Sequence, residues 1–278
     1  MKLSPRYEGP AIIEIEGPFN DCAEPVRRQR RRFEEMLTGF SAQQWQAPSR
    51  CDGWSVHDVV AHLVGVNSFW AMSVIAGISG TPTCVLENFD PAATPPLMVE
   101  PMRSMPTDEL LAQFIATNSQ FLDALAQLDE QQWAATAESP VGHVSIRIVA
   151  YHALWDCWIH ERDVAIPLGI DVEHHDDEIA ACLRYAAAIS PGLALGNSTI
   201  APGIFTVRAT SPDVRFTLDI TKSVAIKNIN SDSPVALLEG SSVDLIEALS
   251  LRAQLAPDAP TEWHELLAGL TRAFDHKL

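Results

Sequence analysis

Along the first two thirds of the chain, apolar residues recur every three or four positions, which predicts helices. The first helix follows Pro25 and ends at Gly39, because proline suits a first helical turn and glycine suits a C-terminal end. Ser55, with Asp58 three residues later, has the pattern of an N-cap and predicts a second helix. Thr107 is expected to cap a third helix.

Two further helices precede a change of pattern. The fourth spans about residues 145–166, after Gly142 and before Pro167. The fifth begins in the acidic stretch 171–178 and ends near Ser190, where a proline and a glycine follow.

After Gly203, apolar and polar residues alternate, as they do in β-strands. Two such runs, 204–209 and 214–220, flank the sequence Ser211-Pro212-Asp213, which is typical of a hairpin turn. We expect two more strands, over 224–229 and 234–238, and two helices, which begin at 240–242 and at Thr261.

Helices followed by mixed strands and helices indicate an α+β fold with two domains that meet near residues 190–203. We expect three parts: a leader over 1–24, a helical bundle over 25–195 and a smaller α+β domain over 196–278. Within the leader, residues 11–15 form either a short strand or an extended segment. The proline-rich residues 81–106 form a long irregular crossover, and loops of this length are usually functional or mobile.

Composition and charge exclude several classes of partner. The net charge of −17 repels phosphate backbones and anionic lipid headgroups, so we expect no nucleic-acid or membrane partner. The arginine-rich run 27–32 is followed by Glu34 and Glu35 and is interpreted as the solvated face of a helix. The cysteines are scattered and form no C-x-x-C pair, which suits reduced thiols in the cytoplasm.

Residues 59–80 contain no Asp, Glu, Lys or Arg and are long enough to span a membrane. His62, Asn67 and several glycines interrupt this segment, and no basic residues flank it closely. A helix buried inside a bundle explains the segment better. The N-terminus also lacks the apolar stretch of a signal peptide, so the sequence predicts a soluble, cytoplasmic protein.

The fourth predicted helix carries most of the candidate chemistry. His152, Asp156 and His160 are spaced by four residues and share one face, and Asp163 lies near the same stripe. Large apolar residues surround them, and a buried charge must be paired or must bind a cation. The spacing leaves two readings open: an internal hydrogen bond between Asp156 and His160, or a shared metal ion.

A third donor on another helix favours the metal. His62 lies among Val59, Val60 and Leu63 on the second predicted helix and faces the core or nearly so. Three nitrogen and oxygen donors leave one position open on a tetrahedral zinc ion, which is the catalytic arrangement. The remaining histidines considered lie off this face or in connections and are weaker candidates: His57, His143, His174 and His175.

Residues 51–63 (CDGWSVHDVVAHL) and 156–163 (DCWIHERD) resemble the two signatures of the mycothiol-dependent maleylpyruvate isomerase family, which is related to the DinB-like bundles. The resemblance implies an up-down-down-up four-helix bundle followed by a sterol-carrier-like α+β domain. It places the metal ligands on His62, Asp156 and His160. The family commonly has Glu at the position of Asp156, and this departure leaves His152 as a possible substitute. It also implies that Arg252 helps to bind an anionic substrate.

The resemblance further implies the cofactors, a divalent metal ion, zinc by preference, and mycothiol or a similar thiol. In this family a thiolate adds to an activated double bond of a small-molecule substrate, the bond rotates and the thiol leaves. Because that thiol comes from outside, Cys51, Cys84 and Cys157 are interpreted as core or loop residues.

Three functions are consistent with this reading of the sequence. The first is a metal- and thiol-dependent isomerase or S-transferase. The second is a metal-binding or sensor protein without catalysis. The third is a hydrolase that uses metal-activated water, with Asp163, Glu161 or His152 as the base.

Overall fold

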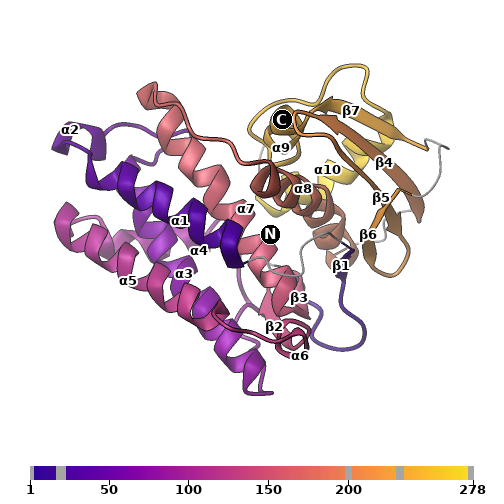
Figure 1. The fold of residues 1–278 in the computed structure, drawn as a ribbon, viewed down its shortest axis with the longest axis horizontal. Coiled ribbons are helices and arrows are strands. Elements are labelled where there is room, and N and C mark those ends of the chain that lie inside the picture. The colour runs from indigo at the N-terminus through magenta and orange to yellow at the C-terminus, as the bar shows by residue number, and fades with distance from the viewer. Residues whose placement is uncertain (1–2, 17–22, 198–201, 230–234, 275–278) are drawn as a thin grey trace.

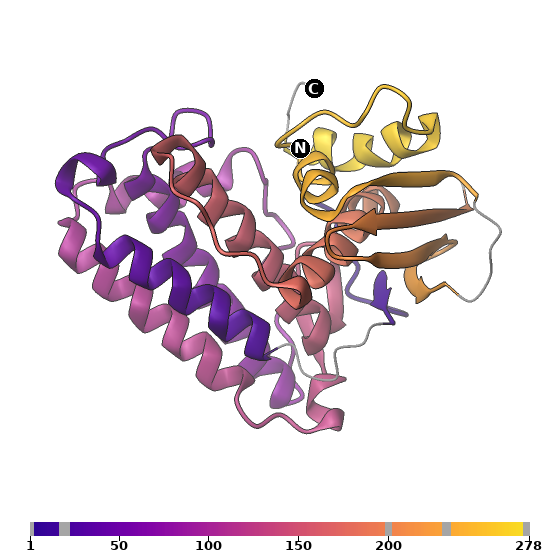
Figure 2. The ribbon, with the colours of Figure 1, turned by 45° about the horizontal axis from the view of Figure 1, so that its top comes forward.

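The computed structural model describes residues 3–16, 23–197, 202–229 and 235–274. Four long helices form a bundle at one side of the molecule (Figure 1): α1 (Ala23–Thr38), α3 (Val56–Ile78), α5 (Thr107–Leu125) and α7 (Ile146–Ala165). A five-stranded sheet with its own helices forms the other side (Figure 2). The predicted α+β fold is confirmed.

The direction of each helix follows from the contacts at its ends. Helices α3 and α5 run parallel, because Nε2 of His57 near the start of α3 donates to the carbonyl of Met105, just before α5, at 3.0 Å. The end of α3 packs against the strand Thr136–Ser139, which follows α5. Arg50, after α1, contacts Asp163 near the end of α7, so α1 and α7 point the other way. The bundle therefore has the up-down-down-up arrangement.

The N-caps were predicted with mixed success. At α3, Ser55 and Asp58 form the expected capping box. At α5 the predicted cap is wrong, because Thr107 is the first helical residue and follows Pro106, which makes no side-chain cap. Ser241 caps α9 (Ser242–Leu249), and α10 (Thr261–Ala273) begins at Thr261 as predicted.

Helix α8 (Asp176–Asn197) continues past its predicted end near Ser190 and includes Pro191. Contacts with α10 hold this last part. The hydroxyl of Ser190 donates to the carbonyl of Leu266 and accepts from the amide of Leu270. Tertiary packing thus outweighs the loss of one helical hydrogen bond at the proline.

Several short elements in the connections were not predicted. Helices α2 (Ala42–Trp45) and α6 (Glu130–Trp133) are single turns, and the crossover contains α4 (Thr94–Val99) and a 3₁₀ turn (Glu100–Met102). A second 3₁₀ turn (Ile166–Leu168) follows α7. Strands β2 (Thr136–Ser139) and β3 (Gly142–Ser145) form a hairpin before α7.

The larger sheet has the strand order β1-β6-β5-β4-β7. Strands β4 (Gly203–Thr210) and β5 (Val214–Ile220) form the predicted hairpin, and β6 (Val224–Asn228) extends it. Strand β7 (Leu237–Ser241) begins later than predicted and pairs in parallel with β4; Pro234 lies outside the described residues. Strand β1 (Ile13–Ile15) pairs in parallel with β6, so the leader contributes an edge strand.

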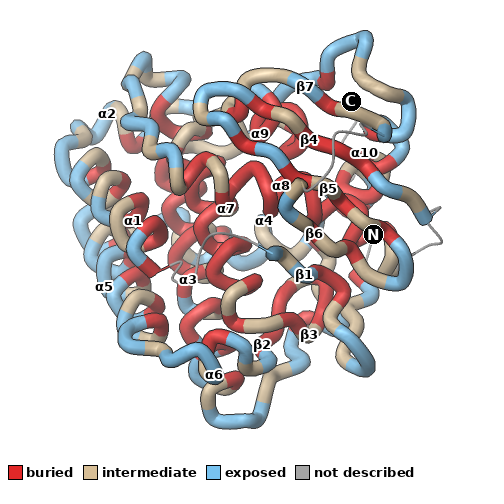
Figure 3. The backbone as a smooth tube through the Cα atoms, turned by 45° about the vertical axis from the view of Figure 1, so that its right-hand side comes forward, coloured by how far each residue is buried: buried red, intermediate tan, exposed pale blue. Residues whose placement is uncertain are grey.

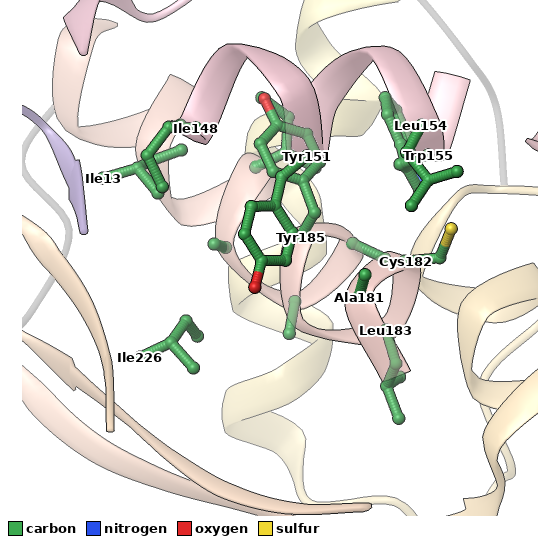
Figure 4. Close-up of a cluster of buried hydrophobic side chains, with 14 of the residues drawn as sticks. Ile13, Ile148, Tyr151, Leu154, Trp155, Ala181, Cys182, Leu183, Tyr185 and Ile226 are labelled. Carbon is green, nitrogen blue, oxygen red and sulfur yellow. The ribbon is translucent and has the colours of Figure 1, made fainter. Parts of the chain in front are cut away.

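Helix α8 joins the two sides of the molecule, since it packs against α7, the sheet, α9 and α10. Its apolar side chains and those of α7 form one continuous core (Figure 4), in which Tyr151 and Trp155 from α7 lie near Tyr185 from α8. The burial pattern shows α7 and α8 as the most enclosed elements (Figure 3).

Among the residues that the structure describes, two helices are long and apolar enough to cross a membrane, α3 and residues 176–196 of α8. Within the protein, 56% of the apolar window of α3 and 83% of that of α8 are buried. Both helices therefore find their apolar partners inside the fold, as expected for α3.

The interpretation of the arginine run as a solvated face is wrong for most of it, because α1 packs between α5, α7 and α8. Arg30 is fully buried and donates to Asn67 and to the carbonyl of Ala153. Its neighbours on the α8 side form ion pairs with the buried carboxylates of Glu161 and Glu178: Arg28 with Glu178, and Arg32 with both. Arg28 also pairs with the partly exposed Asp177.

Candidate metal centre

Three predicted donors come together between α3 and α7. One ligand atom from each of His62, Asp156 and His160 lies within 4.8 Å of the other two. Nε2 of His160 is 3.8 Å from Oδ1 of Asp156, and the rings of His62 and His160 meet edge-on with their centres 5.1 Å apart. The four-residue spacing on α7 places two of these donors one turn apart, and α3 supplies the third.

The internal hydrogen bond that the spacing also allowed is not formed. The 3.8 Å separation of Asp156 and His160 exceeds hydrogen-bonding distance. The other carboxylate oxygen of Asp156, Oδ2, is buried and has no hydrogen-bond partner among the described residues. A buried carboxylate oxygen without a donor normally has a ligand, so the donor set fits a bound cation.

Electrostatics prepare His62 as a neutral ligand. Burial, reinforced by nearby His160, lowers the pKa of His62 to about 3. Its imidazole is therefore uncharged near neutral pH and keeps a free lone pair for a metal. Burial raises the pKa of Asp156, whereas His160 and Arg30 draw it down.

The opposite side of His160 is held by a carboxylate. Nδ1 of His160 is 3.0 Å from Oδ2 of Asp163, so this nitrogen carries the proton and Nε2 faces Asp156. A carboxylate on the far nitrogen commonly fixes the orientation of a metal-binding histidine. Burial opposes a charge on His160, but Cys51 and Asp163 outweigh it and raise the pKa of the imidazole to about 10. At neutral pH the metal-free imidazole therefore also carries a proton on Nε2, which a bound cation would displace.

Two arginines in turn hold Asp163. Arg252 reaches both carboxylate oxygens at 2.8 Å, and Arg50 reaches Oδ1 at 3.1 Å. Burial alone would raise the pKa of Asp163, but its bonds to His160 and Arg252 keep it well below its usual range. The family resemblance implied a role for Arg252 in substrate binding. In the structure Arg252 lies next to the donor group, and its bonds to Asp163 connect the C-terminal part of the chain to the bundle.

Sequence reasoning missed the position of Cys51. It was interpreted as a core or loop residue, yet its Sγ lies 3.2 Å from Asp163 and 3.7 Å from Nδ1 of His160. Cys51, His160 and Asp163 form a second group with metal-binding atoms close together. The two arginines beside it disfavour a cation there. The signal available was the place of Cys51 at the start of the same motif that contains His62.

His152 belongs to neither donor group among the described residues. Its Nδ1 forms a 2.6 Å hydrogen bond with the hydroxyl of Tyr185, and its ring packs against Trp70 and Trp155. Burial lowers the pKa of His152 to about 3. Its surroundings are those of a neutral core histidine, so the geometry favours Asp156 as the ligand on this helix.

Comparisons with known proteins identify the family and the fold. The family model of the mycothiol maleylpyruvate isomerase N-terminal domain matches residues 26–165. Two crystal structures, of the mycothiol-dependent maleylpyruvate isomerase and of a mutant of it, share the fold. Each is 12% identical, has a TM-score of 0.59, and aligns over 86% of this chain and 94% of its own. No curated protein matches the sequence.

Proposed function

We propose that this chain, which belongs to the family of the mycothiol maleylpyruvate isomerase N-terminal domain, is an enzyme with a bound metal and an external thiol. Its reaction is an isomerisation or an S-transfer, and its thiol is one of low molecular weight. The thiol is mycothiol or a close analogue, and the substrate is a small electrophile. The observation that carries the proposal is the open group of His62, Asp156 and His160 between α3 and α7.

The three donors would hold a divalent ion, zinc by preference, because two imidazoles and one carboxylate suit zinc and would leave a position for a thiol. When bound, the metal lowers the pKa of a coordinated thiol and so supplies a thiolate near neutral pH. Asp163 keeps His160 in the tautomer whose Nε2 faces the donor group.

Arg252 has two tasks in this proposal. Its bidentate bond holds Asp163 in place. Its remaining nitrogen, Nη1, has only a 3.5 Å contact with the carbonyl of Ser250 among the described residues, so it can bind a carboxylate of the substrate.

In an isomerisation, a thiolate adds to one carbon of an activated double bond, rotation follows and elimination returns the thiol.

The alternatives have less support. For a hydrolase, each side chain predicted as the base is already engaged, Asp163 and Glu161 by arginines and His152 by a tyrosine. A metal-binding or sensor protein without catalysis would use the same donor group and differs only in lacking turnover. A cytoplasmic location belongs to the proposal, since the scattered cysteines suit a reducing compartment.

Zinc content and thiol turnover test the proposal together. The wild type should bind one zinc ion and accelerate the isomerisation of maleylpyruvate, or the addition of mycothiol to a related electrophile. His62→Ala should lose most of the zinc and lower turnover by about 100-fold or more. His264→Ala, on the exposed face of α10, is the matched control. Stoichiometric zinc without any mycothiol-dependent reaction would favour the non-catalytic alternative.

A further inference from the structure

Arg184 on α8 is a buried cation without a carboxylate partner. Its residue is only 6% exposed, and none of its nitrogens pairs with an Asp or Glu among the described residues. Nη1 donates to the carbonyl of Ala180 at 3.1 Å, and the guanidinium lies 5.4 Å from the centre of the Phe216 ring. Nε is buried and has no hydrogen-bond partner in the described parts of the chain.

Such a charge is unusual because burial of an unpaired ion is costly. A cation–π contact and one carbonyl recover only part of the lost hydration. Burial accordingly lowers the pKa of Arg184. The other buried or half-buried arginines of α1 and of the metal centre have carboxylates or amide oxygens as partners. The buried charge of Arg184 therefore lacks the anionic partner that would stabilise it.

A hollow of about 430 Å³ lies beside this arginine, between α8 and strands β5 and β6, which are neighbours in Figure 1. Arg184, Arg215 and Asn228 line it together with Ala180, Asp213 and Val214. The one carboxylate in the lining, Asp213, already pairs with Arg215 at 2.8 Å. The charge of Arg184 thus remains uncompensated in the lining, in a chain whose net charge is −17.

A second hollow of about 410 Å³ adjoins the first and shares Asp213 and Arg215 with it. Its lining also includes Arg208 and Glu239, which lie directly opposite each other on β4 and β7. The second hollow therefore has a further carboxylate beside its arginines, whereas the charge of Arg184 in the first hollow has none.

We propose that the hollow between α8 and strands β5 and β6 binds a small anion, carrying a carboxylate or a phosphate group, through Arg184 and Arg215. Guanidinium groups recognise both oxyanions by charge-assisted hydrogen bonds. The site shares no residue with the group of His62, Asp156 and His160, and the proposal does not depend on the reaction catalysed there.

Isothermal titration calorimetry on the full chain tests this site, with inorganic phosphate in one arm and succinate in the other, at constant ionic strength. We expect saturable binding of at least one, and the stronger arm identifies the group recognised. Arg184→Met removes the charge but keeps an apolar side chain of similar length, and it should weaken binding by about tenfold or more. Arg215→Gln should weaken it as well and decides the test if the first variant does not fold.

Two controls separate this site from other anion-binding surfaces. Arg27→Gln removes an equal charge from the exposed face of α1 and should leave the affinity unchanged. His62→Ala should also leave the affinity unchanged, because the proposed hollow contains no metal ligand. A loss of affinity in this variant would place the anion on the metal centre instead. The absence of saturable binding of both anions to the wild type would overturn the proposal. Wild-type affinity in folded Arg184→Met would do the same.

Discussion

At the scale of single residues, Asp163 is a buried carboxylate that several side chains hold in place. Its two oxygens lie within hydrogen-bonding distance of four side chains: His160, Cys51, Arg252 and Arg50. Arg50 and Cys51 lie in the connection before α3, His160 lies on α7, and Arg252 follows α9. These bonds fix the orientation of the carboxylate, and the carboxylate in turn orients the imidazole ring of His160 through their hydrogen bond.

Asp163→Asn should therefore weaken zinc binding while the fold persists. The amide keeps the shape but removes the charge that favours the Nδ1–H tautomer of His160, so we expect a 10- to 100-fold loss in zinc affinity. Competition with a chromogenic chelator measures it. Asp108→Asn, on an exposed position of α5, is the matched control. Unchanged zinc affinity in Asp163→Asn would show that the carboxylate does not orient the ligand.

The residue scale also shows how far the sequence could predict the site. His62, Asp156 and His160 were found because helical spacing and the motif around residue 62 are local patterns. The contacts of Arg252 with Asp163 and of Arg50 with Glu247 join positions far apart in the chain. No local pattern encodes such pairs. Arg252 was named only through the family resemblance, and its bond to Asp163 was not foreseen.

At the scale of elements, the closeness of α3 to the β2–β3 hairpin depends on a missing side chain. A Cβ at Gly77 would lie 2.6 Å from the carbonyl oxygen of Thr136 and 3.1 Å from Cβ of Ala137. The sequence predicted the helix but not this contact, because strand β2 shows no clear alternation. The same reason hid the hairpin itself, whereas the alternating β4 and β5 were recognised.

Gly77→Ala should destabilise the protein by about 1–3 kcal/mol, because the backbone of the hairpin must shift to admit the methyl group. Gly65→Ala on the same helix is the control, since its Cβ would meet only the flexible end of Met98 at 3.0 Å. Alanine there should be neutral or stabilising by up to about 1 kcal/mol through helix propensity. Urea unfolding of both variants measures the difference, and equal effects would contradict this account of the contact.

At the scale of the whole molecule, the leader connects the bundle to the sheet. Strand β1 pairs with β6 on the C-terminal side, while the backbone of Arg6 bonds to Val141 and His143 around the β2–β3 hairpin. The hydroxyl of Tyr7 donates to the buried carboxylate of Glu138 at 2.6 Å. The sequence predicted a separate leader, and its pairing partners could not be read from a segment of so few residues.

Tyr7→Phe tests this connection by the removal of one oxygen atom. The loss of a hydrogen bond to a buried carboxylate should cost about 1–3 kcal/mol of unfolding free energy at neutral pH. Burial, together with Glu138, raises the pKa of Tyr7 above its ordinary value of about 10. The folded state therefore holds this proton more tightly, and the associated stability is present below pH 10 and is lost as the pH rises further. Denaturant unfolding at pH 7 and above pH 10 should show the gap between wild type and variant narrowing at high pH. Equal stability of wild type and variant at pH 7 would mean that Tyr7 anchors the leader through packing alone.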